Sequence, residues 1–121
     1  MIDHISIAVS DLDRSTDFYR AVLAPLGFDL LVERPATMGF GKRYSEFWLN
    51  HRPDMAPVAG GTGVHICLRA RTKDAVVAFH AARAAASTSP ARPVPTPLSM
   101  HEWCLRVAGH CEFKEHAVSL R

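Results

Sequence analysis

The chain has 121 residues, enough for one domain that buries roughly two-thirds of the surface of its unfolded form. Hydrophobic residues make up 48% and charged residues 21%, as in an ordinary globular protein, and the net charge is +2. Because Lys and Arg are scattered, we expect no nucleic-acid partner, and no apolar run approaches the roughly 18 residues of a membrane-spanning helix.

The cysteines and the start of the chain bear on the compartment. Cys67, Cys104 and Cys111 are odd in number, lack CxxC spacing and lie in apolar runs, so we expect buried free thiols. Met1 is followed at once by a strand pattern, without the features of a secretion signal. We therefore expect a cytoplasmic protein.

The first half of the chain predicts a strand, a helix and three further strands. Residues 2–9 alternate and are rich in β-branched side chains, which favours a strand. Ser10 with Asp13 resembles a capping box, so we expect Ser10 to cap a helix over about residues 12–26 that ends at Gly27. The further strands are expected at residues 28–33, 38–40 and 44–49.

The second half repeats this order, which makes the chain an α+β protein of two βαβββ modules. The Pro- and Gly-rich stretch at 51–63 is the linker candidate and divides the chain into module one at 1–56, a linker at 57–62 and module two at 63–121. A period of about sixty residues indicates a duplicated module. Module two predicts a strand at 64–70, a helix capped by Thr72, a Pro-rich stretch at 87–99 in place of a strand, and strands at 101–107 and 111–120.

Two histidines occupy matching points of two similar apolar runs. His4 lies in residues 2–9, His65 lies in residues 63–70, and each run leads into a helix pattern. Because side chains alternate along a strand, paired modules would bring both imidazoles to one side of a curved sheet. A histidine in an apolar strand is more often a core residue, but the repetition favours a divalent-metal site with His4 and His65 as ligands.

Two glutamates also correspond between the modules. Glu112 lies between two apolar residues, so it faces either a groove, where burial requires a cation partner, or an exposed edge. Glu115 is its rival, because it lies on the opposite face of a regular strand. Glu46 is the matching residue of module one, and a slip of one residue in its strand would turn it away.

The number of carboxylates decides the chemistry of such a site. Two histidines with one carboxylate leave room for dioxygen and a chelating substrate on non-haem iron. Two histidines with two carboxylates leave about two water positions on an octahedral ion, which suits polarising a carbonyl. In that case a displaced carboxylate, Glu112 or Glu46, serves as the base that moves a proton.

Other residues point less clearly to chemistry. Gly60 to Gly63 precede a strand instead of a helix, which excludes a phosphate loop, and no serine lies in a nucleophile elbow. Pocket walls or ordinary packing are the alternatives for four apolar residues, namely Met38, Phe40, Phe47 and Trp48. A solvated or edge position is expected for the remaining histidines, namely His51, His80, His101, His110 and His116.

The chain resembles the vicinal oxygen chelate superfamily in Ile2-Asp3-His4-Ile5, Val9-Ser10-Asp11-Leu12, Phe18-Tyr19 and Leu26-Gly27-Phe28. That superfamily includes glyoxalase I, extradiol dioxygenases and bleomycin-resistance proteins. The resemblance implies two βαβββ modules that form a cup-shaped mixed sheet around a divalent ion. By position it implies His4 and His65 as ligands, Glu112 as the ligand of the closing strand and Glu46 as the glyoxalase-like fourth ligand.

The residues and the resemblance lead to one functional prediction and one alternative. We predict a divalent-metal-dependent enzyme that acts on a small molecule with vicinal oxygens and uses Fe, Mn, Ni or Zn. A lyase or isomerase reaction is preferred to ring-cleaving oxygenation, because Glu46 is available. The resemblance implies a homodimer, frequently with modules exchanged between subunits. The alternative is a metal-free, bleomycin-resistance-like dimer that sequesters a small molecule.

Overall fold

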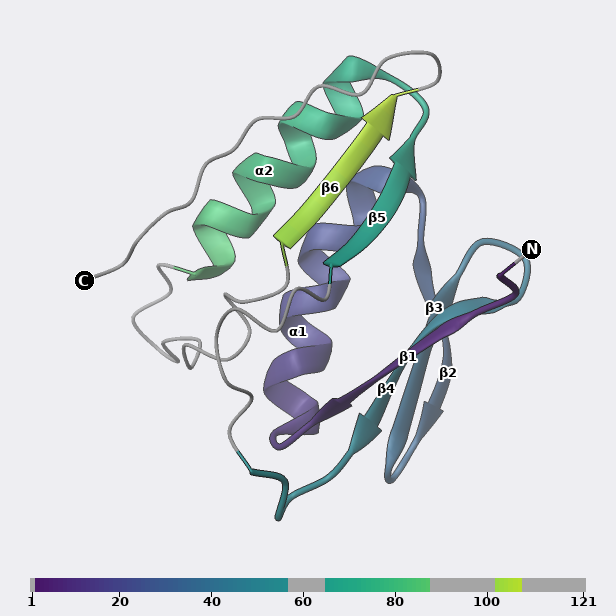
Figure 1. The fold of residues 1–121 in the computed structure, drawn as a ribbon, viewed down its shortest axis with the longest axis vertical. Helices are drawn as coiled ribbons and strands as arrows, with labels where there is room; N and C mark the ends of the chain where they lie inside the picture. The colour runs from purple at the N-terminus through teal and green to yellow at the C-terminus, as the bar shows by residue number, and fades with distance from the viewer. Residues whose placement is uncertain (1, 57–64, 88–101, 108–121) are drawn as a thin grey trace.

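The computed structural model describes residues 2–56, 65–87 and 102–107 (Figure 1). Their elements are, in chain order, β1 (Ile5–Val9), α1 (Leu12–Leu23), the 3-10 helix η1 (Ala24–Leu26), β2 (Asp29–Arg34), β3 (Thr37–Gly41), β4 (Ser45–His51), β5 (His65–Ala70), α2 (Lys73–Ser87) and β6 (Glu102–Val107). Residues 88–99 of the Pro-rich stretch and the strand expected at 111–120 lie outside the described residues.

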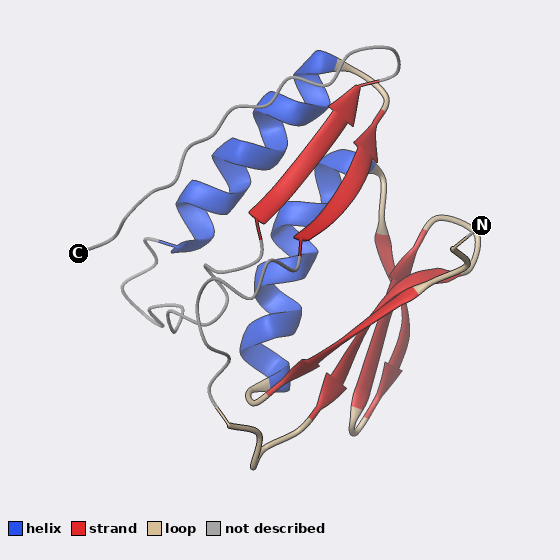
Figure 2. Cartoon of the chain, in the orientation of Figure 1, coloured by secondary structure: helices blue, strands red, loops and turns tan. Residues whose placement is uncertain are grey.

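Module one is a four-stranded mixed sheet with α1 packed against one face (Figure 2). The strand order is β1-β4-β3-β2, in which β1 runs parallel to β4 and the other neighbours are antiparallel. The βαβββ order predicted for this half, and with it the α+β class, is confirmed.

The strands of module two form a separate sheet. β5 and β6 run parallel, which is also the relation between β1 and β4. The described strands therefore make a four-stranded sheet and a two-stranded ladder instead of one continuous sheet. The predicted cup of two complete modules is not confirmed by the described residues.

Alternation along the strands gives the four-stranded sheet an inner face and an outer face. On the inner face, Phe40, Phe47 and Leu49 are fully buried against α1, whose Tyr19 ring lies 5.0 Å from the ring of Phe47. Burying each such side chain stabilises the fold by about 2 kcal/mol. The opposite side, which we call the outer sheet face, carries Ser6 and Ala8 of β1, Thr37 and Gly39 of β3, and Trp48 and Asn50 of β4.

The ends of the first helical segment follow from its capping residues. The N-cap of α1 is Asp11, whose extended backbone lets its carboxylate accept the Arg14 backbone N–H at 3.0 Å. The prediction of Ser10 as the cap was wrong by one residue. The predicted stop is confirmed, because Gly27 has a φ of 77° and donates its N–H to the Ala24 carbonyl at 2.9 Å.

The two modules meet through their helices. α1 and η1 pack against α2, and the β5–β6 ladder also contacts α2 (Figure 1). Phe79 is buried in the core shared with α1, and the Thr72 Oγ1 accepts the Ala75 N–H at 3.2 Å, so the predicted cap of this helix is confirmed. No helix in the described ranges has the length and hydropathy needed to cross a bilayer.

Candidate functional site

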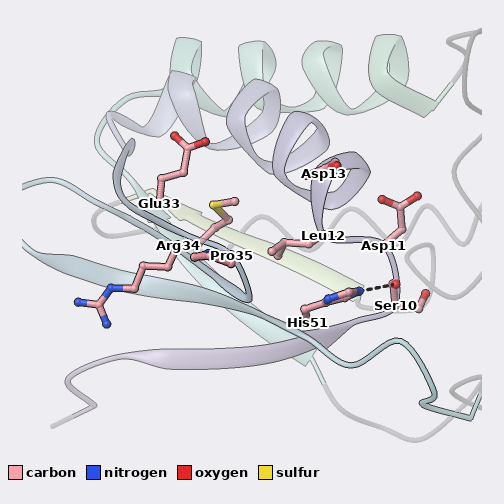
Figure 3. Close-up of a pocket in the computed structure, with 9 residues that line it drawn as sticks. Ser10, Asp11, Leu12, Asp13, Glu33, Arg34, Pro35 and His51 are labelled. Carbon is pink, nitrogen blue, oxygen red and sulfur yellow. Dashed lines mark hydrogen bonds between the residues drawn. The ribbon is translucent and has the colours of Figure 1, made fainter.

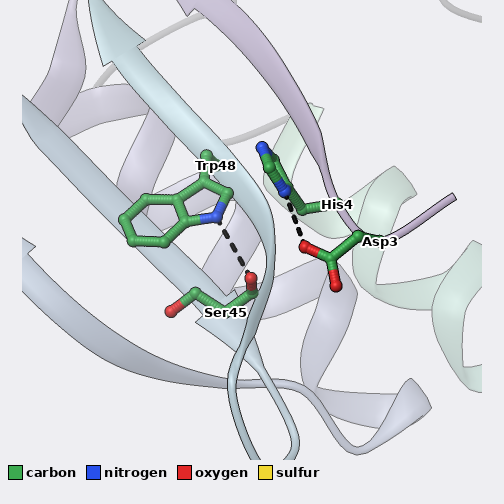
Figure 4. A network of polar contacts seen from close by, with 4 residues as sticks. All are labelled: Asp3, His4, Ser45 and Trp48. Carbon is green, nitrogen blue, oxygen red and sulfur yellow. Dashed lines mark hydrogen bonds and ion pairs between the residues drawn. The ribbon is translucent and has the colours of Figure 1, made fainter.

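His4 lies immediately before β1, where pairing with β4 begins, and not in the middle of a strand as expected. Its side chain is 53% exposed, which excludes the alternative of a core histidine. Nδ1 of His4 lies 2.9 Å from Oδ2 of Asp3 (Figure 4). When Nδ1 donates to this carboxylate, Nε2 carries the lone pair, as in metal-binding histidines that are oriented by a neighbouring carboxylate.

Glu46 stands level with His4 on the neighbouring strand. Ile5 pairs with Phe47 in the parallel β1–β4 ladder, so His4 and Glu46 each precede one member of the same pair. Position 46 lies between Phe47, which is buried on the inner face, and Ser45, whose Oγ lies over Gly39 on the outer sheet face. Through the β1–β4 register, two of the four predicted ligand positions lie on adjacent strands.

An irregularity in the sheet also falls at Glu46. Phe40 pairs with Phe47, but the next residue, Gly41, pairs with Ser45, so Glu46 is the extra residue of a bulge opposite β3. The slip of one residue considered from the sequence thus occurs in the pairing of β4 with β3. The pairs of β4 with β1, from Ile5–Phe47 onward, are regular. Bulges re-aim side chains and are frequent beside functional sites.

Trp48 covers the backbone of β3 on the outer sheet face. A Cβ atom at Gly39 would lie 2.9 Å from Cζ3 of Trp48 and 2.6 Å from Oγ of Ser45, so this packing requires glycine. The Trp48 indole N–H donates to the Ser45 carbonyl at 3.1 Å (Figure 4). The partly exposed ring therefore presents a fixed aromatic surface on the outer sheet face.

A polar row that sequence reasoning missed crosses the same face. The Asn50 Nδ2 donates to the Ser6 Oγ, and the Thr37 Oγ1 donates to the Asn50 Oδ1. The row joins β1, β4 and β3, and Ser6 at its end is exposed. Its signal in the sequence was the i, i+2 spacing from His4 to Ser6 and from Trp48 to Asn50.

The second half of the predicted site is described only by its backbone. His65 opens β5 and pairs with Glu102 of β6, whereas Glu112 and its rival Glu115 lie outside the described residues. Within the described ranges, no group of three or more His, Cys, Asp or Glu side chains is arranged to hold a metal ion. The described side chains therefore include two of the four predicted ligands, one imidazole and one carboxylate, which are chemically suited to a divalent ion.

Several other predicted roles are settled by burial. Met38, Phe40 and Phe47 belong to the core, so the packing alternative holds for them, while Trp48 is partly exposed. Cys67 is exposed, which makes the expectation of a buried thiol wrong there: it alternates with partly buried neighbours and faces away from the core.

A separate cavity of about 570 Å³ lies at the start of α1 (Figure 3). The Nε2 of His51 lies 3.2 Å from the Ser10 carbonyl in its wall. Its charged lining comes from the N-terminal turn of α1 and from the end of β2, namely Asp11, Asp13, Glu33 and Arg34. Met38 also lines it from the inner face, so the cavity is distinct from the outer sheet face.

The fold agrees with the comparisons with known proteins. The chain belongs to the Glyoxalase/Bleomycin resistance protein/Dioxygenase superfamily, whose family model matches residues 1–103. The family predicted from the sequence is confirmed. No curated protein matches the chain.

Solved structures share the fold. A glyoxalase/bleomycin resistance protein from Albidiferax ferrireducens T118 is 27% identical with a TM-score of 0.61, over 70% of this chain and 68% of that one. A glyoxalase/bleomycin resistance protein/dioxygenase from Nocardioides is 16% identical with a TM-score of 0.54, over 94% of this chain and 88% of that one. A family enzyme from Burkholderia phytofirmans PsJN is 19% identical with a TM-score of 0.51, over 70% and 72%.

Proposed function

We propose that the chain is a cytoplasmic enzyme that uses a divalent metal ion to act on a small molecule with vicinal oxygens. A lyase or isomerase reaction is preferred to ring-cleaving oxygenation. The observation that carries the proposal is the level placement of His4 and Glu46 on adjacent parallel strands. An imidazole beside a carboxylate suits Fe(II), Mn(II), Ni(II) or Zn(II).

The backbone of module two supports the proposal by repeating this arrangement. His65 pairs with Glu102 in the parallel β5–β6 ladder, just as His4 stands level with Glu46. Two such His–Glu rows are what a duplicated four-ligand site requires. Glu102 is therefore a second candidate for the carboxylate of module two. The first is Glu112, which the resemblance implies as the ligand of the closing strand.

The described residues have definite tasks under this proposal. When bound, the ion supplies a positive charge that polarises the substrate oxygens. Asp3 holds the His4 ring through Nδ1 and leaves Nε2 as the ligand atom. Glu46 would be the second ligand of module one and would also be the base that accepts a proton from a substrate carbon. The Trp48 ring excludes water from the adjacent part of the sheet.

We further propose that the complete site is shared between the subunits of a homodimer. The strands that the structure describes form two separate sheets, and the two halves of the chain meet through α1 and α2. The outer sheet face of one subunit is therefore available to module two of the other. That exchange would bring His65 of one chain to His4 of its partner.

The proposal is tested by elemental analysis of the full chain, purified without chelator or nickel resin. We expect about one divalent ion per chain, with an affinity that falls at acid pH because His and Glu ligands must be deprotonated. Protein that neither retains nor takes up Fe(II), Mn(II), Ni(II) or Zn(II) under anaerobic reconstitution would overturn it.

Two substitutions separate the carboxylates of module two. Loss of metal in Glu102→Gln with full retention in Glu112→Gln would identify Glu102, the residue indicated by the strand register, as the ligand. The reverse result would identify Glu112, the residue implied by the resemblance. Either result is read against the wild-type content measured in parallel.

Sequestration without chemistry is the second candidate function, and the exposed edge of the Trp48 indole favours it. An aromatic surface on an open sheet face can bind a planar or cationic ligand by stacking. Metal-free protein would then bind an aromatic cation such as a bleomycin-type drug, and Trp48→Ala would abolish that binding. The metal-dependent proposal instead expects the metal-free protein to bind no such ligand.

A further inference from the structure

Cys67 of β5 and Cys104 of β6 occupy paired positions in the parallel ladder. Cys67 is exposed and alternates with Ile66 and Leu68, which are partly buried. We propose that Cys67 and Cys104 are a redox-responsive pair that forms a disulfide across the two strands and fastens β6 to β5. This proposal does not rest on the proposed enzymatic function.

The backbone register satisfies the main geometric requirement of such a bond. Neighbouring strands lie about 4.8 Å apart. Disulfides join residues whose Cα atoms are about 4.4 to 6.8 Å apart. Because Cys67 and Cys104 are partners in the ladder, no shift of either strand is needed, and alternation assigns both positions to the same face. Cys111 lies outside the described residues.

The position of the pair gives the bond a consequence. In the described part of the chain the β5–β6 ladder has two strands, and two-stranded sheets are marginally stable by themselves. The strands are joined through α2 and residues 88–101, so the disulfide closes a long loop and restricts the unfolded chain. Oxidation therefore stabilises module two. It also holds the neighbouring row, His65 with Glu102, in register.

The reaction needs an oxidant, and a small disulfide such as oxidised glutathione is sufficient. The exposed Cys67 thiolate attacks one sulfur of oxidised glutathione, forms a mixed disulfide and releases one glutathione thiolate. The Cys104 thiolate then attacks the Cys67 sulfur and releases the second glutathione thiolate. Two protein thiols are oxidised, and one small disulfide is reduced to two thiols. Since an exposed disulfide is readily reduced, excess reduced glutathione reverses both steps.

The experiment uses the full chain, reduced and then equilibrated at graded ratios of oxidised to reduced glutathione. Free thiols are alkylated, and the tryptic peptides are analysed by mass spectrometry. We expect one crosslink within a single chain, between the peptides of Cys67 and Cys104, in the wild type and in Cys111→Ser. Cys67→Ser should form none. Because Cys67 is exposed, this variant should fold even where Cys104→Ser does not.

Thermal unfolding provides the second readout. Oxidation should raise the midpoint of Cys111→Ser and leave that of Cys67→Ser unchanged. Crosslinks to Cys111, crosslinks between chains, or stable glutathione adducts on Cys67 would overturn the pairing. Resistance of both thiols to oxidation because they hold zinc would overturn it as well.

Discussion

Tyr19 is fully buried against the sheet, with the ring of Phe18 5.2 Å away. Burial raises the pKa of its phenol well above the ordinary value. The folded chain therefore keeps this proton at a pH where the unfolded chain releases it. The resulting stability is fully present below about pH 10 and falls as the pH rises beyond it.

Alkaline unfolding tests whether Tyr19 causes this loss of stability. The wild type is denatured with urea at pH values from about 8 to about 11, on either side of the ordinary tyrosine pKa of about 10. Its free energy of unfolding should fall above about pH 10. Tyr19→Phe should lose less of its own free energy of unfolding over the same range. Equal losses in the two chains would show that another group governs alkaline stability.

The residues of the site were partly predictable from the sequence. The repeat indicated the matched His and Glu positions, and the exposure of His4 agrees with a site instead of a core position. The bulge at Glu46 was not predictable, because it depends on how two hairpin strands align. The row from Ser6 to Thr37 was missed because its members come from three strands.

At the scale of elements, the start of α1 depends on the carboxylate of Asp11. Replacing Asp11 by Ala leaves the Arg14 N–H without its partner and should cost about 1 kcal/mol of stability. The neighbouring Ser10→Ala is the matched control and should change stability by less than about 0.5 kcal/mol. Urea unfolding with an unchanged slope measures both. A larger loss in Ser10→Ala than in Asp11→Ala would restore the capping role to Ser10.

Element types were easier to predict than their pairing. Periodicity and turn residues gave the helices and the strands of module one, with Gly27 as the first stop. The parallel pairing of β1 with β4 joins segments about forty residues apart, and nothing local in the sequence sets that register. It is this register that makes His4 and Glu46 neighbours.

At the scale of the whole molecule, the described strands of the two halves form separate sheets, and the halves meet through α1 and α2. The repeat in the sequence predicts two modules. It does not predict how they associate, because the same matched histidines can meet within one chain or between two. Sharing between subunits is the arrangement proposed above.

Mixing two variants that each lack one histidine ligand tests whether the metal site is shared between subunits. His4→Ala and His65→Ala each remove a ligand from every site, so each homodimer should bind little metal. After unfolding and refolding together, half of the dimers are mixed, and each mixed dimer has one site with both histidines. About a quarter of the wild-type metal content should return, since site composition follows the two-fold symmetry. No recovery would mean that each site is built within one chain.

The most direct test of the account is calorimetric titration of the metal-free chain with Mn(II) or Ni(II). The wild type and His80→Ala, which changes an exposed histidine of α2, should each bind about one ion per chain. His4→Ala and Glu46→Gln should bind at least about tenfold more weakly, since they lose a ligand. Equal affinities in all four chains would contradict the claim that the paired positions of β1 and β4 form half of a metal site.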